Sequence, residues 1–185
     1  MPHTNSYPPD LLGRASKIKL LLMDCDGVLT DGRIYLLEGP DKRLFETKTF
    51  NTKDGIAFAW AYAAGIETGI ISGRKSPAVE ERARTAHMRY LFQGNTTKLP
   101  LFEEVLKDSG FAPEQIGYIG DDLTDLPLMR RCGLAAAPAD SAPLVLEAAH
   151  FVTPANGGEG AVRNVIELLL VAQNRWDEVL AKYNV

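Results

Sequence analysis

Two aspartates, Asp24 and Asp26, stand directly after a run of apolar residues. A carboxylate in the first position can attack phosphorus and form an acyl phosphate, which divides hydrolysis of a phosphate ester into two easier steps. A carboxylate two residues later can protonate the leaving oxygen and then deprotonate the attacking water. Gly27 lets the backbone turn sharply, which leaves amides free to bind phosphate oxygens. The cluster therefore predicts Asp24 as nucleophile and Asp26 as proton shuttle.

Three further polar residues suit the same chemistry. Ser72 and Asp121 each end an apolar run, and Lys98 begins an expected helix. Ser72 can donate a hydrogen bond to a phosphate oxygen, and Lys98 can balance its charge. Asp121 and Asp24 offer the hard oxygen ligands that select Mg²⁺, which holds a phosphoryl group in line and neutralises its charge. Alone, each is an ordinary surface, turn or helix-cap residue; together they indicate one site.

Short apolar runs alternate with amphipathic stretches, as strands and crossover helices do in a parallel sheet. Strands are expected at about 18–23, 68–71, 90–92, 116–119, 134–136 and 151–152. Helices are expected at about 55–64, 77–85, 98–109, 126–132, 142–148 and 161–172. We therefore expect a doubly wound, mainly parallel α/β sheet of the Rossmann-like kind. The carboxyl ends of such strands meet at one crevice, which would bring the polar residues together.

One segment breaks the alternation. Residues 33–50 contain two apolar stretches on either side of Gly39-Pro40, and they predict a β-hairpin inserted at about residues 32–50. The length of the chain suits one domain, which we place at residues 17–185. Residues 1–16 are polar and carry three prolines. They are expected to form an N-terminal tail, mobile to about Pro9.

Composition narrows the classes of function. Hydrophobic residues make up 45% and charged residues 24%, as in an ordinary globular protein, and the net charge of -4 indicates no nucleic-acid or anionic-membrane partner. No segment approaches the roughly 18 apolar residues that span a bilayer. The two cysteines, Cys25 and Cys132, are expected to be free thiols in the cytoplasm, with Cys25 a small filler beside the nucleophile.

The site residues resemble the four motifs of the haloacid dehalogenase superfamily of phosphatases, in the stretches Asp24-Cys25-Asp26-Gly27-Val28, Ser72, Lys98 and Gly120-Asp121-Asp122-x-x-Asp125. The similarity extends over about residues 17–173. It implies that Gly73 joins Ser72 and Lys98 in binding phosphate. It also implies that Asp26 belongs with Asp24 and Asp121 to the metal site, and that Asp122 and Asp125 support the ligands from behind.

The intervals 31–54 and 72–98 have no room for a cap domain, and this resembles the capless branch of the superfamily. Its members close their active sites with a neighbouring subunit, so the resemblance implies a homotetramer. The hairpin is expected to form the central contact. The loop 157–160 and Arg163 are candidates to reach a neighbour's site.

The resemblance also implies a substrate that is a phosphorylated sugar acid. The first expectation is 3-deoxy-D-manno-octulosonate 8-phosphate, and the alternative is an acylneuraminate 9-phosphate. Arg74 and Arg82 match basic positions near the sugar-acid pocket, and arginine suits a carboxylate partner. Lys53 stands where the family pattern has arginine, and it completes the expected substrate contacts.

Two other classes of protein remain in view. A phosphate-accepting signalling domain also combines an acceptor aspartate, a hydroxyl, a lysine and Mg²⁺, but its acidic pair precedes the acceptor. Here the pair Asp121-Asp122 comes last, and Asp26 supplies a proton shuttle that a durable phosphoaspartate does not need. A catalytically idle assembly subunit would be expected to lack a nucleophile or a metal ligand, and a phosphatase assay with and without chelator distinguishes it.

Overall fold

The computed structural model describes residues 7–184, and a six-stranded parallel sheet forms its centre. Its strand order is β5-β4-β1-β6-β7-β8. The strands are β1 (Leu20–Met23), β4 (Glu67–Ser72), β5 (Tyr90–Gln93), β6 (Ile116–Ile119), β7 (Leu134–Ala137) and β8 (Phe151–Val152). The chain runs outward from β1 to β4 and β5, then returns to β6 on the other side of β1. This reversal opens a crevice at the carboxyl ends of the strands.

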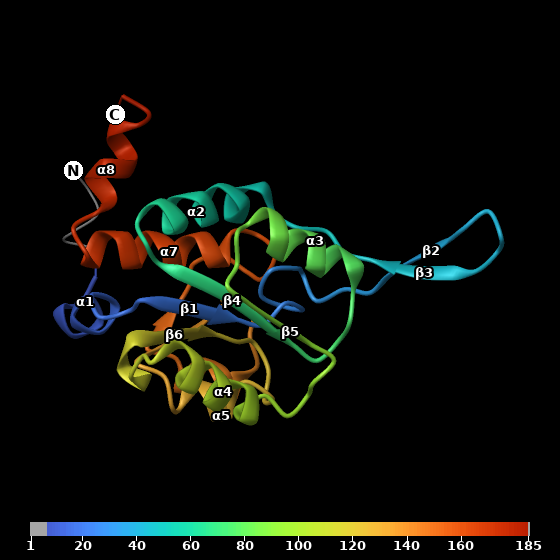
Figure 1. Ribbon diagram of the computed structural model, residues 1–185, viewed down its shortest axis with the longest axis horizontal. Helices are drawn as coiled ribbons and strands as arrows, with labels where there is room; N and C mark the ends of the chain where they lie inside the picture. Colours follow the sequence, from blue (N-terminus) through green and yellow to red (C-terminus); the bar gives the residue numbers. More distant parts are fainter. Residues whose placement is uncertain (1–6, 185) are drawn as a thin grey trace.

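Helices cover both faces of the sheet (Figure 1). One layer contains α2 (Thr52–Ala63), α3 (Pro77–Thr85) and α7 (Ala161–Ala172), and the other contains α4 (Leu99–Ser109), α5 (Leu126–Met129) and α6 (Pro143–Ala148). Side chains of a strand alternate between faces, so Leu21 and Met23 of β1 enter the first core and Leu20 and Leu22 enter the second. The predicted doubly wound α/β fold without a cap is confirmed.

Every predicted strand and helix is present, with small shifts of the ends. The helix expected from residue 55 begins at Thr52, because the side chain of Asn51 accepts a hydrogen bond from the Lys53 amide and caps it. The helix expected to reach residue 132 ends at Met129. A short 3₁₀ turn, Pro113–Gln115, leads into β6.

The N-terminal tail prediction is wrong for residues 9–15, which form helix α1 (Pro9–Ala15). Proline is favoured in the first turn of a helix, and Leu11 and Ala15 are buried in the core that α7 also builds. Residues 1–6 of the predicted tail lie outside the described residues. A further helix that was not predicted, α8 (Trp176–Ala181), follows α7. Both α1 and α8 lie at the end of the molecule opposite the hairpin (Figure 1).

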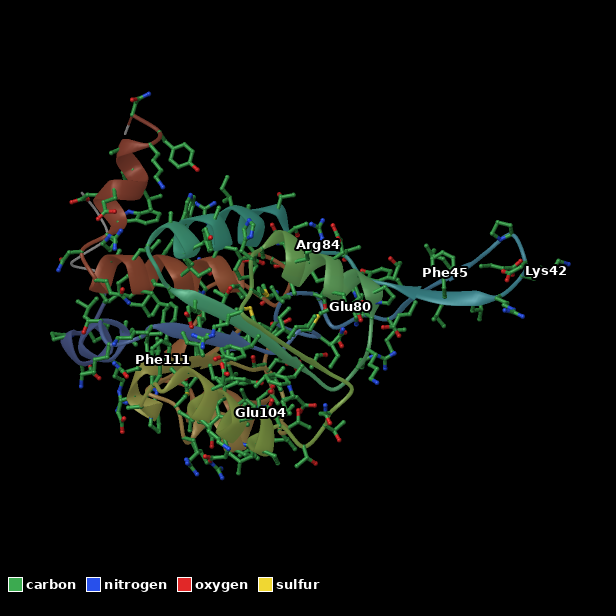
Figure 2. All side chains as sticks on the ribbon, viewed as in Figure 1. Lys42, Phe45, Glu80, Arg84, Glu104 and Phe111 are labelled. Atoms are coloured by element: carbon green, nitrogen blue, oxygen red, sulfur yellow. The ribbon has the colours of Figure 1, made fainter. Side chains whose placement is uncertain are left out.

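The predicted hairpin is present as β2 (Tyr35–Glu38) and β3 (Leu44–Thr47), which pair antiparallel and form a sheet of their own. We call it the arm, because it extends away from the body (Figure 1). Lys42 lies at its far end and Phe45 along it, well away from Glu104 and Phe111 on the body (Figure 2). Five apolar side chains on and beside its strands are 49% to 65% exposed: Ile34, Leu36, Leu37, Leu44 and Phe45. The arm is therefore not folded back onto its own domain.

Both cysteines are buried and free, as predicted. Burial raises the pKa of each thiol to about 12, so the thiolate form is strongly disfavoured. Cys25 is thus a packing residue beside Asp24. Between residues 7 and 184 no helix combines the length and the hydrophobicity needed to cross a bilayer.

Candidate active site

A crevice of about 260 Å³ is lined by residues that follow the carboxyl ends of β1, β4 and β6. These strand ends point toward the arm (Figure 1). Its lining combines carboxylates, hydroxyls and cations: Asp24, Asp26, Gly32, Gly73, Arg74, Thr96, Lys98, Asp121, Asp122 and Thr124. Most of the residues singled out in the sequence therefore meet at one place. Thr96 and Thr124 were not anticipated.

Asp24 is held firmly at the end of β1. Its amide donates to the carbonyl of Ile119 at 2.9 Å, which continues the pairing with β6. Its Oδ1 accepts the Cys25 amide at 2.6 Å, and its Oδ2 lies 2.9 Å from Lys98 Nζ. Burial raises the pKa of Asp24 to about 6, while Lys98 opposes that shift. The ammonium of Lys98 thus favours the ionised form of Asp24, which burial disfavours.

Lys98 precedes α4 and is almost completely buried. Its Nζ lies 2.6 Å from Asp125 Oδ1 as well as 2.9 Å from Asp24. Burial acts to lower the pKa of Lys98, but the two carboxylates raise it above the ordinary value. The ammonium is therefore a fixed positive charge beside Asp24.

Asp125 is fully buried, and each of its oxygens accepts two hydrogen bonds. Oδ1 accepts from Lys98 and from the hydroxyl of Tyr118, and Oδ2 accepts the amides of Asp121 and Asp122 at 3.0 and 3.2 Å. Any Cβ at Gly120 would lie 2.3 Å from the Cβ of Asp125, so only glycine fits there. Asp125 thus contacts Lys98 and the amide of Asp121 at once. Its third partner, Tyr118, was not predicted because it belongs to a buried strand.

Asp121 has an unsatisfied oxygen. Its Oδ1 is buried without a hydrogen-bond partner, and carboxylate oxygens of Asp24, Asp121 and Asp125 lie within 4.8 Å of one another. Burial, together with Asp24 and Asp125, raises the pKa of Asp121 to about 8. Gly27 has φ +83°, and a Cβ there would lie 2.0 Å from Asp121 Oδ2. Such crowded anionic oxygens fit a hard divalent cation, with Asp24 and Asp121 as its side-chain ligands.

Asp26 lies apart from this cluster of carboxylates. Its Oδ1 accepts a hydrogen bond from Lys48, whose side chain is only 3% exposed. Burial acts to lower the pKa of Lys48, but Asp26 reverses the effect and the net shift is upward. Glu46 pairs with Lys48 at 3.2 Å and also with Arg74. The structure therefore places Asp26 in the lining of the crevice with Lys48 as the side-chain partner of its carboxylate.

Sequence reasoning missed Glu46 and Lys48. They are two residues apart in an extended segment, so their side chains point to the same side. Their alternation can be read from the sequence, but nothing in the sequence indicated that they contact Asp26 and Arg74 at the crevice.

Ser72 ends β4 and is buried just beneath the crevice. Its Oγ accepts the amide of Arg74 at 3.3 Å, which shapes the turn. Gly73 and Arg74 line the crevice itself. Ser72 is therefore next to a residue that lines the crevice, and it does not line the crevice itself.

Two expected substrate contacts are not brought to the crevice. The guanidinium of Arg82 lies 5.5 Å from the ring centre of Phe50 and 5.4 Å from that of Phe58, and burial lowers its pKa. Lys53 is exposed and lines a separate hollow beside Arg163. Within this chain Arg82 is thus a packing residue, and Lys53 points elsewhere.

Comparisons with known proteins agree with this geometry. Residues 82–166 match the model of a family described as haloacid dehalogenase-like hydrolase. The chain is 44% identical over 169 residues to the 3-deoxy-D-manno-octulosonate 8-phosphate phosphatase KdsC of Escherichia coli strain K12, covering 91% of this chain and 88% of that protein.

Solved structures are also similar. A probable YrbI family phosphatase from Pseudomonas syringae superposes with a TM-score of 0.91 at 45% identity, over 96% of this chain and 99% of that chain. The 3-deoxy-D-manno-octulosonate 8-phosphate phosphatase of Moraxella catarrhalis, solved with a magnesium ion, a phosphate ion and KDO, gives a TM-score of 0.90 at 34% identity, over 96% and 99%.

Proposed function

The chain belongs to the haloacid dehalogenase-like hydrolases, and we propose that it is a phosphatase that hydrolyses 3-deoxy-D-manno-octulosonate 8-phosphate. The observation that carries the proposal is the pairing of Asp24 with Lys98 at 2.9 Å, with Asp121 clustered beside it and Asp26 in the lining of the same crevice. Relatives named for this substrate are 44% identical over nearly the whole chain, which supports the choice of sugar acid.

In the first step an oxygen of Asp24 attacks phosphorus. The bond from phosphorus to the sugar oxygen breaks, and its electron pair stays on that oxygen. Asp26, in its protonated form, donates a proton to the departing alcohol. Lys98 keeps Asp24 ionised and oriented before attack, because its ammonium lies 2.9 Å from the carboxylate. The product is a phosphorylated Asp24 and a free sugar acid.

In the second step water attacks the same phosphorus. Asp26, now a carboxylate, accepts a proton from that water, and the bond between phosphorus and Asp24 breaks. The amides that follow Asp24, together with Gly73 and Lys98, provide donors for the phosphate oxygens. Mg²⁺, when bound at Asp24 and Asp121, supplies charge neutralisation for the phosphoryl group and aligns it. Asp26 and a water therefore regenerate the free enzyme.

Arg74 is the residue best placed to select a sugar acid. It lines the crevice, and its side chain is 47% exposed, so a substrate carboxylate can reach its guanidinium. A planar guanidinium binds a carboxylate through two parallel hydrogen bonds. An acylneuraminate 9-phosphate also carries a carboxylate far from its phosphate, and it remains the alternative substrate.

The assembly we propose is a homotetramer built on the arm. The crevice is open, and a capless site needs another chain to exclude water and contact the sugar. The exposed apolar side chains of the arm form the surface that such a partner would cover. Buried free thiols suit a reducing compartment, and we propose the cytoplasm.

A screen of phosphorylated sugar acids, ranked by kcat/KM, tests the function. The octulosonate 8-phosphate should rank first and the acylneuraminate 9-phosphate lower. Neutral hexose phosphates of similar size serve as the matched control for the carboxylate. A neutral sugar phosphate in first place would overturn the proposed substrate, and no phosphate release from any ester would overturn the proposed activity.

A further inference from the structure

Two charged residues at the base of the arm contact side chains that line the crevice. Glu46 is in β3 and Lys48 follows it, and their alternation directs both side chains to the same side. Lys48 donates to Asp26 and pairs with Glu46 at 3.2 Å, while Glu46 also pairs with Arg74. A continuous row of four charges thus connects the arm to the proton shuttle.

Lys48 is more deeply buried than Asp26, and this difference indicates which of the two can contact a substrate. The Lys48 side chain is 3% exposed, so it makes little contact with solvent or with a bound sugar. The Asp26 side chain is 25% exposed. In the described part of the chain, Lys48 is the one side chain that donates a hydrogen bond to the Asp26 carboxylate. Lys48 therefore holds one oxygen of Asp26 and leaves the other available.

We propose that Lys48 is a positioning residue for proton transfer, and that Glu46 fixes Lys48 in turn. This inference rests on the proposed phosphatase activity and concerns the same site. When the bond to the sugar oxygen breaks, Asp26 gives that oxygen its proton, and Lys48 transfers none. Its ammonium fixes the carboxyl group of Asp26 by binding Oδ1, which leaves Oδ2 to carry the proton that goes to the leaving oxygen.

The size of the effect follows from geometry. A displacement of about 1 Å at a reacting group can reduce a rate by about a hundredfold. Without Lys48, Asp26 is free to exchange between rotamers, and only some of these reach the leaving oxygen. The loss should depend on how much the leaving group needs a proton. A basic alkoxide needs one, whereas 4-nitrophenolate leaves without help.

The experiment compares Lys48→Met, Lys48→Arg and the control Lys107→Met, which changes an exposed lysine on α4. The substrates are phenyl phosphate and 4-nitrophenyl phosphate, which have similar size but leaving groups of different basicity. The readout is kcat/KM, which covers substrate binding and the first chemical step and excludes hydrolysis of the phosphorylated Asp24. K48M should lose at least about tenfold more activity on phenyl phosphate than on 4-nitrophenyl phosphate. K48R should retain most activity on both, and K107M should match wild type.

Glu46→Gln gives a second test in case K48M does not fold. It removes the charge that holds Lys48 with little change in size, so it should shift the same ratio in the same direction by a smaller factor. Equal losses on the two esters in both variants would overturn the positioning role, and so would no loss in folded K48M. These results are distinct from failure of the proposed function, in which the wild type releases no phosphate from any ester.

Discussion

Asp125 accepts the backbone amide of Asp121 at 3.0 Å, so the residue that anchors Lys98 also fixes the segment that carries the proposed metal ligand. The buried carboxylate of Asp125 thereby helps to position two positive charges beside Asp24. One is the ammonium of Lys98, and the other is the proposed cation at Asp121. The two residues, four apart in the sequence, have different tasks. Asp121 offers a carboxylate oxygen to the crevice, and Asp125 fixes the turn between them by accepting the amides of Asp121 and Asp122.

Replacement of the nucleophile should nearly abolish turnover. Asp24→Asn is close to isosteric, yet its amide cannot form the acyl phosphate. We expect phosphate release to fall by at least about a hundredfold, since loss of a nucleophile costs orders of magnitude. Circular dichroism should show an unchanged fold, and Asp10→Asn on α1 is the matched control. A residual rate above about a tenth of wild type would contradict the assignment.

Removal of the metal should silence the enzyme. Excess chelator should stop phosphate release, and Mg²⁺ should restore it, while Ca²⁺ should do so poorly because it takes more ligands at longer distances. Mg²⁺ should also raise the melting temperature of the wild type by neutralising the buried carboxylates, and Asp121→Asn should lose most of that shift. Full activity after verified metal removal would exclude the mechanism.

Stability in chelator should depend on pH. Burial raises the pKa of Asp54 to about 6 and that of Asp121 to about 8, whereas both are near 3.8 in an ordinary setting. A raised carboxyl pKa means that the folded state holds its proton more tightly, so stability is highest at low pH in this window. The free energy of unfolding should fall as the pH rises from about 4 to about 8. Urea titrations at a series of pH values measure this free energy. In Asp121→Asn it should depend less on pH above about pH 6.

The arm should control assembly. Leu36→Glu and Phe45→Glu place charges on side chains that are more than half exposed in one chain. If these side chains form the subunit contact, both variants should become monomeric in light-scattering measurements and should lose sugar-acid specificity. Tyr62→Glu, on an exposed residue of α2, is the control. Monomeric variants with full specificity would show that the interface does not complete the site.

The two arginines should respond differently. Arg74→Met should raise KM for the sugar-acid phosphate, with a small effect on phenyl phosphate, which has no carboxylate. Arg82→Met should instead lower the melting temperature, because its guanidinium packs between Phe50 and Phe58. Kinetics and thermal denaturation of the same two variants distinguish these outcomes. A large rise in KM for R82M alone would return Arg82 to the list of substrate contacts.

The sequence predicted the sheet and its crevice because their signals are local. Each strand is an apolar run, and Asp24, Ser72 and Asp121 stand where those runs stop. Helix α1 was missed because a seven-residue segment beside prolines has no helical signal of its own. The helix is stabilised by the burial of Leu11 and Ala15, which the sequence does not show. Lys48 was missed for a related reason, since its partner Asp26 lies 22 residues away and only the path of the arm brings them together.

The positions of α1 and α8 have a practical consequence. Both lie at the end of the body opposite the arm (Figure 1). The crevice is lined by residues that follow the carboxyl ends of β1, β4 and β6, and these strand ends point toward the arm (Figure 1). An affinity tag or a surface anchor joined beyond α8 would therefore leave the crevice unobstructed. Molecules attached to a sensor in this way would share one orientation and present their arms outward. Binding of a second, free copy of the chain could then be followed directly on the sensor. Immobilised Leu36→Glu would be the control that does not bind.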